Sequence, residues 1–221
     1  MAYTFCLLLA NWFDIRLIHL FSLDTDAGTL IFPFSFLLAD LITEVYGYKH
    51  TRRAIWLAFL CNLIFIIYGQ LVTHLPSPSY ATNNNVFDDL MTLNTRIIFA
   101  SFISYWLAEP TNIYILAKLK IRFQGRYMGG RFLLSTVIAS GLDSVAFGYI
   151  AFYGLISQQN LLYLIGTMCF FKVAIECMGM PFSVYLAQKL KNYEKLDVYD
   201  IDTKFTLFSL KTNYLLSNNR G

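Results

Sequence analysis

Charged side chains are scarce in this sequence: Asp, Glu, Lys and Arg make up 14% of its 221 residues, against 57% hydrophobic residues. A water-soluble domain carries about 25% charged residues, which it needs to cover its surface. The mean hydropathy of +0.51 agrees with this shortage. Apolar runs of about 20 residues recur along the chain, and runs of that length cross a bilayer as helices. The sequence therefore excludes an ordinary soluble domain and predicts an all-α bundle of transmembrane helices.

The sequence also lacks the motifs of catalysis, metal binding and disulfide formation. It contains no GxSxG, HExxH or Walker A pattern, so we predict neither an enzyme nor a chain that hydrolyses ATP. The four cysteines form no CxxC and no ligand pattern with the three histidines. Because all the cysteines lie within apolar runs, we interpret them as free thiols packed like small hydrophobic side chains. We predict no metal site and no cofactor, and the scattered basic residues exclude a nucleic-acid binder.

Six apolar segments are predicted to cross the membrane as one transmembrane domain over residues 1–191, followed by a short cytoplasmic tail over 192–221. Five of them are long enough to cross about 30 Å of hydrocarbon at about 1.5 Å per residue. The first would reach only about 20 Å. Either its helix continues through Asp14, Arg16 and His19 or the true start lies upstream, and we favour the second. The six segments are Met1–Phe13, Thr29–Tyr48, Ala54–Leu75, Thr95–Leu119, Phe132–Ile156 and Leu161–Leu190.

The connecting segments alternate in charge, which predicts the orientation of the helices. Residues 48–53, 118–131 and the tail from Lys189 are rich in Lys and Arg, whereas 76–94 and 157–160 contain none. Because basic loops stay on the cytoplasmic side, six spans with both termini in the cytoplasm fit this pattern. We also predict a long external loop at 76–94, a flexible joint at Met128–Gly130 and a short strand or lip at Asp197–Phe208.

Four ionisable residues, Asp40, Glu109, Asp143 and Lys172, each lie within about four residues of the middle of a predicted span, which is roughly 6 Å in depth. Facing lipid unpaired, they would together cost roughly 10–14 kcal/mol, so they must face each other or a wet cavity. Three carboxylates against one ammonium leave an excess of acid. A cationic or hydrogen-bond-donating ligand, or a carried proton, would explain that excess. An ion-pair lock without a ligand, joining Lys172 to Asp143 or Glu176, is the alternative.

Neighbouring side chains at helical spacing extend this polar cavity. Carboxylates and amides beside aromatic faces suit a flat heterocycle, because rings stack and carboxylates accept hydrogen bonds from its N–H edge. The sequence therefore favours a polar cavity within the membrane that binds a small planar molecule. The neighbours that share these helix faces are Glu44, Glu176, Tyr105, Trp106 and Asn112.

An ordered set of short motifs covers nearly the whole chain, from about Asn11 to Phe208. The set resembles the signature of the queuosine precursor transporter family, also called the vitamin uptake transporter family and formerly a domain of unknown function. Glu109 and Asn112 stand where relatives carry a Gln and an Asp, so the donor–acceptor pattern is permuted. The motifs are Phe32-Pro33, Asp40-Leu-Ile-Thr-Glu44-Val-Tyr46-Gly47, Arg52-Arg53, Arg96, Ser101-Phe102, Ser104-Tyr105, the stretch from Ser140 to Phe147, Phe171-Lys172, Pro181 and Asp197-Val-Tyr-Asp200.

The resemblance implies a six-helix importer in the bacterial cytoplasmic (inner) membrane. It would take up queuosine precursors, the cyano and aminomethyl forms of deazaguanine, for tRNA modification. The resemblance also implies a protein that works alone, by secondary transport. A proton carried by Asp40 or Glu44 is the candidate coupling ion. The family's shape is also similar to the vitamin-binding subunits of energy-coupling-factor transporters. A substrate-binding subunit that depends on a separate energising complex is therefore the alternative, and a structural or assembly membrane protein is a third hypothesis.

Each charged or polar residue of the cavity is expected to have a role in such an importer. Carboxylates would accept from the N–H edge of the precursor, and the ammonium would donate to its carbonyl or balance the acids. The expected binding residues are Asp143, Glu109, Asn112, Lys172, Tyr105 and Trp106. The residues expected to carry a coupling proton or to gate the cytoplasmic side are Asp40, Glu44 and Glu176, with Arg52 and Arg53 as anchors at the membrane interface.

Overall fold

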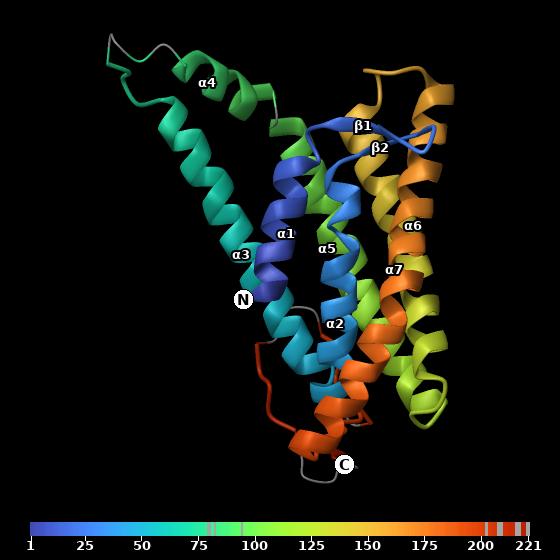
Figure 1. Cartoon of the computed structure of the whole chain (residues 1–221). Coiled ribbons are helices and arrows are strands. Elements are labelled where there is room, and N and C mark those ends of the chain that lie inside the picture. Colours follow the sequence, from blue (N-terminus) through green and yellow to red (C-terminus); the bar gives the residue numbers. More distant parts are fainter. Residues whose placement is uncertain are drawn as a thin grey trace.

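Helices build most of the molecule in the computed structural model, which describes residues 1–78, 81, 83–93, 95–201, 203–206, 210–214 and 218–219. In these residues the chain forms seven α-helices, a short 3-10 helix and one two-stranded hairpin (Figure 1). In chain order the elements are α1 (Ala2–Phe13), β1 (Leu17–Leu20), β2 (Leu23–Asp26), η1 (Gly28–Leu30), α2 (Pro33–Tyr46), α3 (Tyr48–Thr73), α4 (Asn84–Leu93), α5 (Thr95–Arg122), α6 (Met128–Phe152) and α7 (Gln158–Glu194).

The helical membrane bundle that the composition predicts is confirmed. Within the described residues, four segments are long and apolar enough to cross a bilayer: Gly28–Tyr46, Tyr48–Thr73, Met128–Phe152 and Gln158–Glu194. The other two predicted spans coincide with α1, which has 12 residues, and with α5, which has 28. At about 1.5 Å per residue α1 reaches only about 18 Å. A six-span crossing with both termini inside stays a prediction.

Helix α2 lies at the centre of the bundle and positions several of the buried charges. It contacts α1, α3, α5, α6 and α7, and it is the most buried of the four candidate spans. Pro33 starts α2, since proline suits the first helical turn. Gly47 ends α2 with φ of +85°, a conformation that favours glycine. Because α3 begins at Tyr48, the loop expected over 48–53 is wrong, and Gly47 alone joins the two helices.

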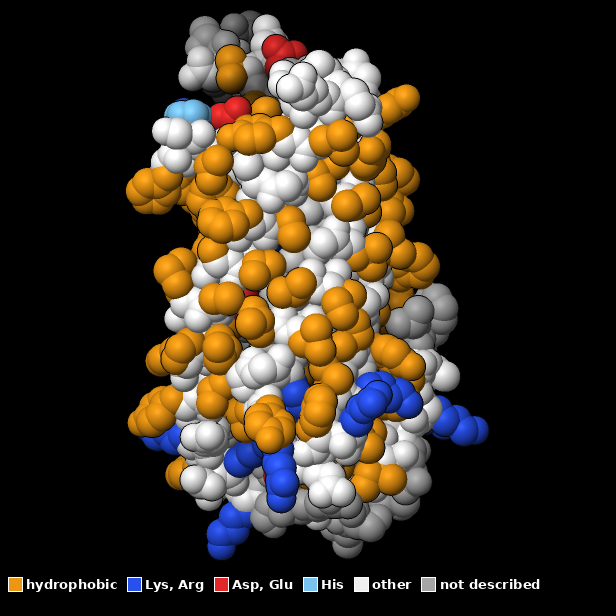
Figure 2. Space-filling model, turned by 90° about the vertical axis from the view of Figure 1, so that its right-hand side faces the viewer, with side chains coloured by type: hydrophobic (Ala, Val, Ile, Leu, Met, Phe, Trp, Pro, Cys, Tyr) orange, Lys and Arg blue, Asp and Glu red, His pale blue; other side chains and the backbone are white. Residues whose placement is uncertain are grey.

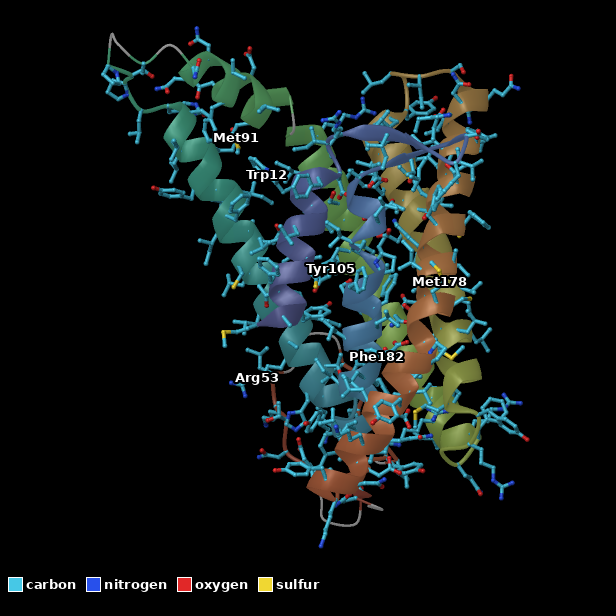
Figure 3. The ribbon with its side chains drawn as sticks, in the orientation of Figure 1. Trp12, Arg53, Met91, Tyr105, Met178 and Phe182 are labelled. Carbon is cyan, nitrogen blue, oxygen red and sulfur yellow. The ribbon has the colours of Figure 1, made fainter. Side chains whose placement is uncertain are left out.

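The surface of the bundle is apolar along its sides and basic at one end. Met178 and Phe182 on α7 point outward in Figure 3 and are 73% and 68% exposed, as lipid-facing side chains are. Figure 2 shows Lys and Arg side chains gathered toward the lower end of the molecule. This end carries the α2–α3 and α5–α6 turns and the C-terminus (Figure 1). The distribution agrees with the predicted orientation, in which the lower end faces the cytoplasm.

Two further loop predictions are wrong. The segment 76–94 contains α4, where Met91 is buried against Gly69 of α3 and accepts a hydrogen bond from Gln70 at 2.9 Å. Met128–Gly130 forms the first turn of α6 and not a flexible joint. A side chain at position 129 would meet Met180 Sδ at 2.6 Å, so the absence of a Cβ there lets α6 and α7 approach closely. Contacts between helices thus order two segments whose composition is typical of loops.

A β-hairpin at the upper end and a folded tail at the lower end were not expected from hydropathy. Strands β1 and β2 pair antiparallel, with Leu17 opposite Asp26 and Leu20 opposite Leu23. At the other end α7 continues to Glu194. The strand expected over Asp197–Phe208 is absent from the described residues 197–201 and 203–206, and positions 202, 207 and 208 lie outside the described residues.

The orientation can be tested by labelling single cysteines in a background without the four native ones. A cysteine at Asn84, at the start of α4, should react with a membrane-impermeant thiol reagent in intact cells. A cysteine at Gln124, in the α5–α6 turn, should react only after the cells are permeabilised, because basic turns stay inside. Reversed labelling would contradict the orientation of the whole bundle.

Candidate functional site

Among the described residues, polar side chains that are buried or partly buried form three clusters that follow one another along the bundle. Helices α2 and α7 both run from the upper to the lower end (Figure 1), so their residue numbers give the order of the clusters. The upper cluster contains Asp14, Asp26, Asp143 and Lys172; the middle cluster contains Asp40, Glu109, Asn112 and Glu176; and the lower cluster contains Glu44, Lys120, Arg131, Lys191 and Asp197.

The upper cluster holds three carboxylates around one ammonium. Lys172 Nζ donates to Asp143 Oδ2, and the two residues are only 4% and 2% exposed. Asp26 accepts from the backbone N–H and the hydroxyl of Thr29, each at 2.6 Å. Asp14, which follows α1 directly, accepts from a serine hydroxyl of α5 at 2.8 Å. One buried cation therefore faces three buried acids, of which it pairs directly with one.

Two aromatic rings and a small cavity adjoin the upper cluster. Phe32 and Phe147 line this cavity with the charged residues, and Lys172 Nζ lies 5.0 Å from the centre of the Phe32 ring. The cavity has a volume of about 10 Å³, which is about the space that one water molecule needs. Asp143 Oδ1 and Asn11 Nδ2 are buried and have no hydrogen-bond partner among the described residues. An open acceptor, an open donor and two aromatic rings thus meet at one place.

The middle cluster holds three carboxyl groups and an amide, all 0% exposed. Asn112 Nδ2 donates to Asp40 Oδ1 at 2.7 Å, and Ser35 Oγ donates to Glu109 Oε1 at 2.9 Å. Glu176 of α7 is the acidic neighbour of both Asp40 and Glu109. Three helices, α2, α5 and α7, therefore each contribute one carboxyl group to the same buried region.

The lower cluster is a network of charges centred on Glu44. Arg131 donates to both carboxylate oxygens of Glu44, at 2.7 and 3.0 Å, and Lys191 donates to one of them at 2.6 Å. Lys120 Nζ lies 3.9 Å from the same carboxylate. Lys120 and Lys191 also pair with Asp197, at 2.7 and 2.8 Å. The network thereby joins α2, α5, α6 and α7 to the C-terminal tail.

A second set of contacts holds the tail against the start of α3. The backbone N–H of Tyr48 donates to Asp200 Oδ2 at 2.9 Å. Arg52 is 3% exposed and donates to the carbonyls of Thr206 and Lys211 at 2.7 and 3.0 Å. The expectation that Arg52 anchors at the membrane interface is therefore wrong: its guanidinium satisfies backbone carbonyls of the tail. The tail covers the lower end of the bundle as a structural part of it.

The structure distributes the expected site residues over three clusters and does not gather them around one point. Tyr105 lies in the middle of the bundle in Figure 3, where its hydroxyl is 2.9 Å from that of Tyr3 of α1, beside Glu109. Trp106 is 38% exposed and lines an outer pocket with Tyr114, together with none of the cluster residues. The binding and coupling roles stay predictions. The expected residues lie in the upper cluster (Asp143, Lys172), the middle cluster (Asp40, Glu109, Asn112, Glu176) and the lower cluster (Glu44).

Six charged members of these clusters are not among the expected site residues; two of them, Lys191 and Asp197, lie at the end of α7 and in the tail. Asp14 and Asp26 lie on either side of the hairpin. The sequence gives one local indication that Asp26 is buried: Thr29 follows it by three residues, a spacing at which an Asp side chain accepts a hydrogen bond from the backbone N–H. Lys120 and Arg131 belong to a segment that we had interpreted as a basic loop. Both lie within helices, at 2% and 1% exposure, and no local pattern distinguishes them from the exposed basic residues nearby.

Comparison with known proteins finds relatives over most of the chain. Residues 26–186 match the family described as "Putative vitamin uptake transporter". A "Probable queuosine precursor transporter" of Bacillus subtilis (strain 168) is 23% identical over 189 residues, which cover 84% of this chain and 81% of that protein. The "Queuosine precursor transporter" of Escherichia coli (strain K12) is 30% identical over 132 residues, 58% of this chain and 56% of that protein. No solved structure matches the chain. The family match includes the whole middle cluster.

The pairing of Asp197 predicts how firmly the tail is held. Partial burial alone would raise the pKa of Asp197, but Lys120 and Lys191 hold it below its usual value. Asp197 therefore stabilises the attached tail above its unfolded pKa of about 3.9, and this contribution is lost as the pH falls through the lower folded value. Asp197→Asn should remove charge-assisted bonds of about 1.5 kcal/mol, which makes local opening about tenfold more frequent.

Limited trypsin digestion of the purified protein in detergent measures this opening at the exposed Lys204. Cleavage there should be about tenfold faster in Asp197→Asn than in the wild type. Asp24→Asn is the matched control, because Asp24 is exposed on the hairpin at the opposite end. Equal cleavage rates in all three proteins would contradict the role of Asp197.

Proposed function

The chain belongs to the vitamin uptake transporter family, whose members are transporters and not enzymes, and from this premise we propose that it imports queuosine precursors. The proposed substrates are the cyano and aminomethyl forms of deazaguanine, which are small and planar. The proposed process is secondary transport across the bacterial cytoplasmic membrane. The names of the two relatives support the substrate class, and the buried acids support a ligand that carries N–H groups.

The upper cluster is the proposed substrate site, and the open acceptor on Asp143 carries this assignment. Asp143 Oδ1 is buried and has no partner among the described residues, although its other oxygen binds Lys172. A guanine-like edge presents adjacent N–H groups, and a carboxylate oxygen such as Asp143 Oδ1 can accept a hydrogen bond from them. Phe32 and Phe147 offer rings for stacking, and Lys172 lies where it can donate to a carbonyl of the ligand.

Binding requires the upper cluster to widen. A bicyclic ring is many times larger than the cavity of about 10 Å³, which suits a single water molecule. The helices that line the cavity must therefore move apart as the ligand enters, as they do in transporters that alternate between two open states. We propose that the lower cluster holds the opposite end closed, with Glu44 as the gating residue. Its three cations come from α5, α6 and α7, so its carboxylate joins four helices.

The role of Asp143 can be tested with labelled cyano-deazaguanine and the purified protein. Asp143→Asn replaces an acceptor by a donor and should weaken binding about 10- to 150-fold, because a charge-assisted bond contributes about 1.5–3 kcal/mol. The melting temperature should change little, since Asp14 and Asp26 remain near Lys172 to balance its charge. Asp24→Asn, at an exposed position, is the matched control.

The alternative for this pair is an ion-pair lock without a ligand. In that case Asp143→Asn would leave a buried ammonium poorly paired, with a loss of about 3–5 kcal/mol of stability. The double variant Asp143→Asn with Lys172→Met would then restore the melting temperature and bind the probe normally. That result would refute the proposed substrate site.

The substrate class can be tested in bacterial cells that cannot synthesise the precursor. With the protein present, limiting external cyano-deazaguanine should give queuosine-modified tRNA, and without the protein it should not. Equal modification in both strains would refute the assignment. In liposomes, binding of the probe by the purified protein without transport would instead favour a substrate-binding subunit of a larger complex.

A further inference from the structure

The middle cluster contains three carboxyl groups that no cation neutralises within the described part of the chain. Asp40, Glu109 and Glu176 are each 0% exposed, and none of them takes part in an ion pair among the described residues. The nearest ammonium on α7 belongs to Lys172, one turn before Glu176, and it pairs with Asp143 in the upper cluster. A carboxylate buried without a cation is so unfavourable that the group takes up a proton instead.

Open hydrogen-bonding atoms around these groups suit protonated carboxyls. Asp40 Oδ2, Glu109 Oε2 and both carboxyl oxygens of Glu176 are buried without a partner among the described residues. Independently of the acids, two buried polar side chains nearby also have open atoms: the hydroxyl of Thr136 on α6, which neighbours Glu176, and the amide oxygen of Asn112 on α5. A protonated carboxyl donates one hydrogen bond and needs such an acceptor, whereas an ionised carboxylate only accepts.

The arrangement suits a proton better than a metal ion. Hard metal cations require several oxygen ligands that converge within about 2–2.6 Å of one point. Among the described residues no three acidic, histidine or cysteine side chains lie close enough to form such a site. A proton needs only one oxygen and a neighbouring acceptor, and the middle cluster offers several of these pairs.

The surroundings contain no free cation among the described residues that would compete with a proton. The charged groups closest along the chain are Glu44, which has its own three cations, and the Asp143–Lys172 pair. The polar and titratable groups that face the three acids come from four helices: Tyr3 of α1, Ser35 and Glu44 of α2, Tyr105 and Asn112 of α5, and Thr136 and Asp143 of α6. On α7, Lys172 lies one turn before Glu176 and pairs with Asp143.

From these observations we infer that the middle cluster is the proton-carrying site that drives transport, with Asp40, Glu109 and Glu176 as the carriers. This inference rests on the proposed function and assigns Glu109 to coupling, not to substrate binding. A proton from the outer side forms an O–H bond with one carboxylate oxygen, and the same bond breaks when the proton passes to water on the cytoplasmic side. Glu176 is one turn from Lys172 and Asp40 one turn from Glu44, so a charge change here acts on both neighbouring clusters.

The test uses the purified full chain in liposomes, with labelled cyano-deazaguanine as the probe and two assays. Exchange of internal for external probe requires no net proton movement and measures transport itself. Accumulation against an imposed pH gradient, acidic outside, measures coupling. With one proton per substrate, each unit of pH difference should raise the accumulation ratio up to about tenfold. A sodium gradient at equal pH should have no effect.

Glu176→Gln is the central variant and Glu194→Gln its matched control on the same helix, where Glu194 is exposed and accepts from Tyr46 at 2.7 Å. Glu176→Gln should retain exchange within about threefold but lose the response to the pH gradient, and Asp40→Asn and Glu109→Gln should weaken that response. The control should retain both activities. Each middle-cluster variant should melt within a few degrees of the wild type, because an amide resembles a protonated carboxyl in shape and charge.

The outcomes separate the inference from the proposed function. No exchange by the wild type overturns the proposed function. Accumulation that responds to a sodium gradient and not to a pH gradient overturns the inference alone, and so does a full pH response of accumulation in all three middle-cluster variants. A large fall in melting temperature in all three variants would also overturn it, because it would mean that the acids are ionised and structurally paired.

Discussion

The free-energy cost of burying charge away from water governs the arrangement of this bundle. Each buried charge must be paired, hydrogen-bonded or neutralised by a proton. The lower cluster meets this constraint with ion pairs, since Glu44 contacts three cations. The upper cluster meets it with one ion pair, Lys172 with Asp143, and with hydrogen bonds to Asp14 and Asp26. In the middle cluster the described residues provide no cation at all, and this contrast is the reason for assigning the three clusters different roles.

Helix α2 connects the clusters mechanically as well as electrostatically. Asp40 and Glu44 lie one turn apart on it, so a rotation or shift of α2 moves both. Directly after Glu44 the helix ends at Gly47, and α3 starts with the residues that hold the tail. A helix with many neighbours cannot move without repacking all of them, because protein interiors are close-packed. A change in protonation at Asp40 therefore has a short structural route to the lower end of the bundle.

Sequence patterns predicted the elements better than the pairs between them. Length and hydropathy located the apolar helices, and the cost of intramembrane charge identified Asp40, Glu109, Asp143 and Lys172 as buried. The same patterns did not distinguish the buried Tyr105 from its neighbour Trp106, since both are aromatic and one residue apart. They placed Arg131 in a loop, because the partner that draws it inside is Glu44, 87 residues away. Local periodicity indicates which face of a helix is buried. Ion pairs between helices that are distant in sequence depend instead on the tertiary packing.

A buried charge network such as the lower cluster is destabilised strongly by the loss of one partner but only weakly by opening of the whole network to water. Removing one partner leaves an unpaired charge inside and costs about 3–5 kcal/mol. Opening the whole end admits water, and every charge then exchanges its partner for hydration. Because burying an ion pair gains little over hydrating the two charges separately, that concerted opening costs far less than the loss of one partner. The ion pairs of Glu44 with Arg131 and Lys191 therefore hold this end together while water is excluded, and they separate at low cost once water enters. These are the properties that the proposed gating role of Glu44 requires.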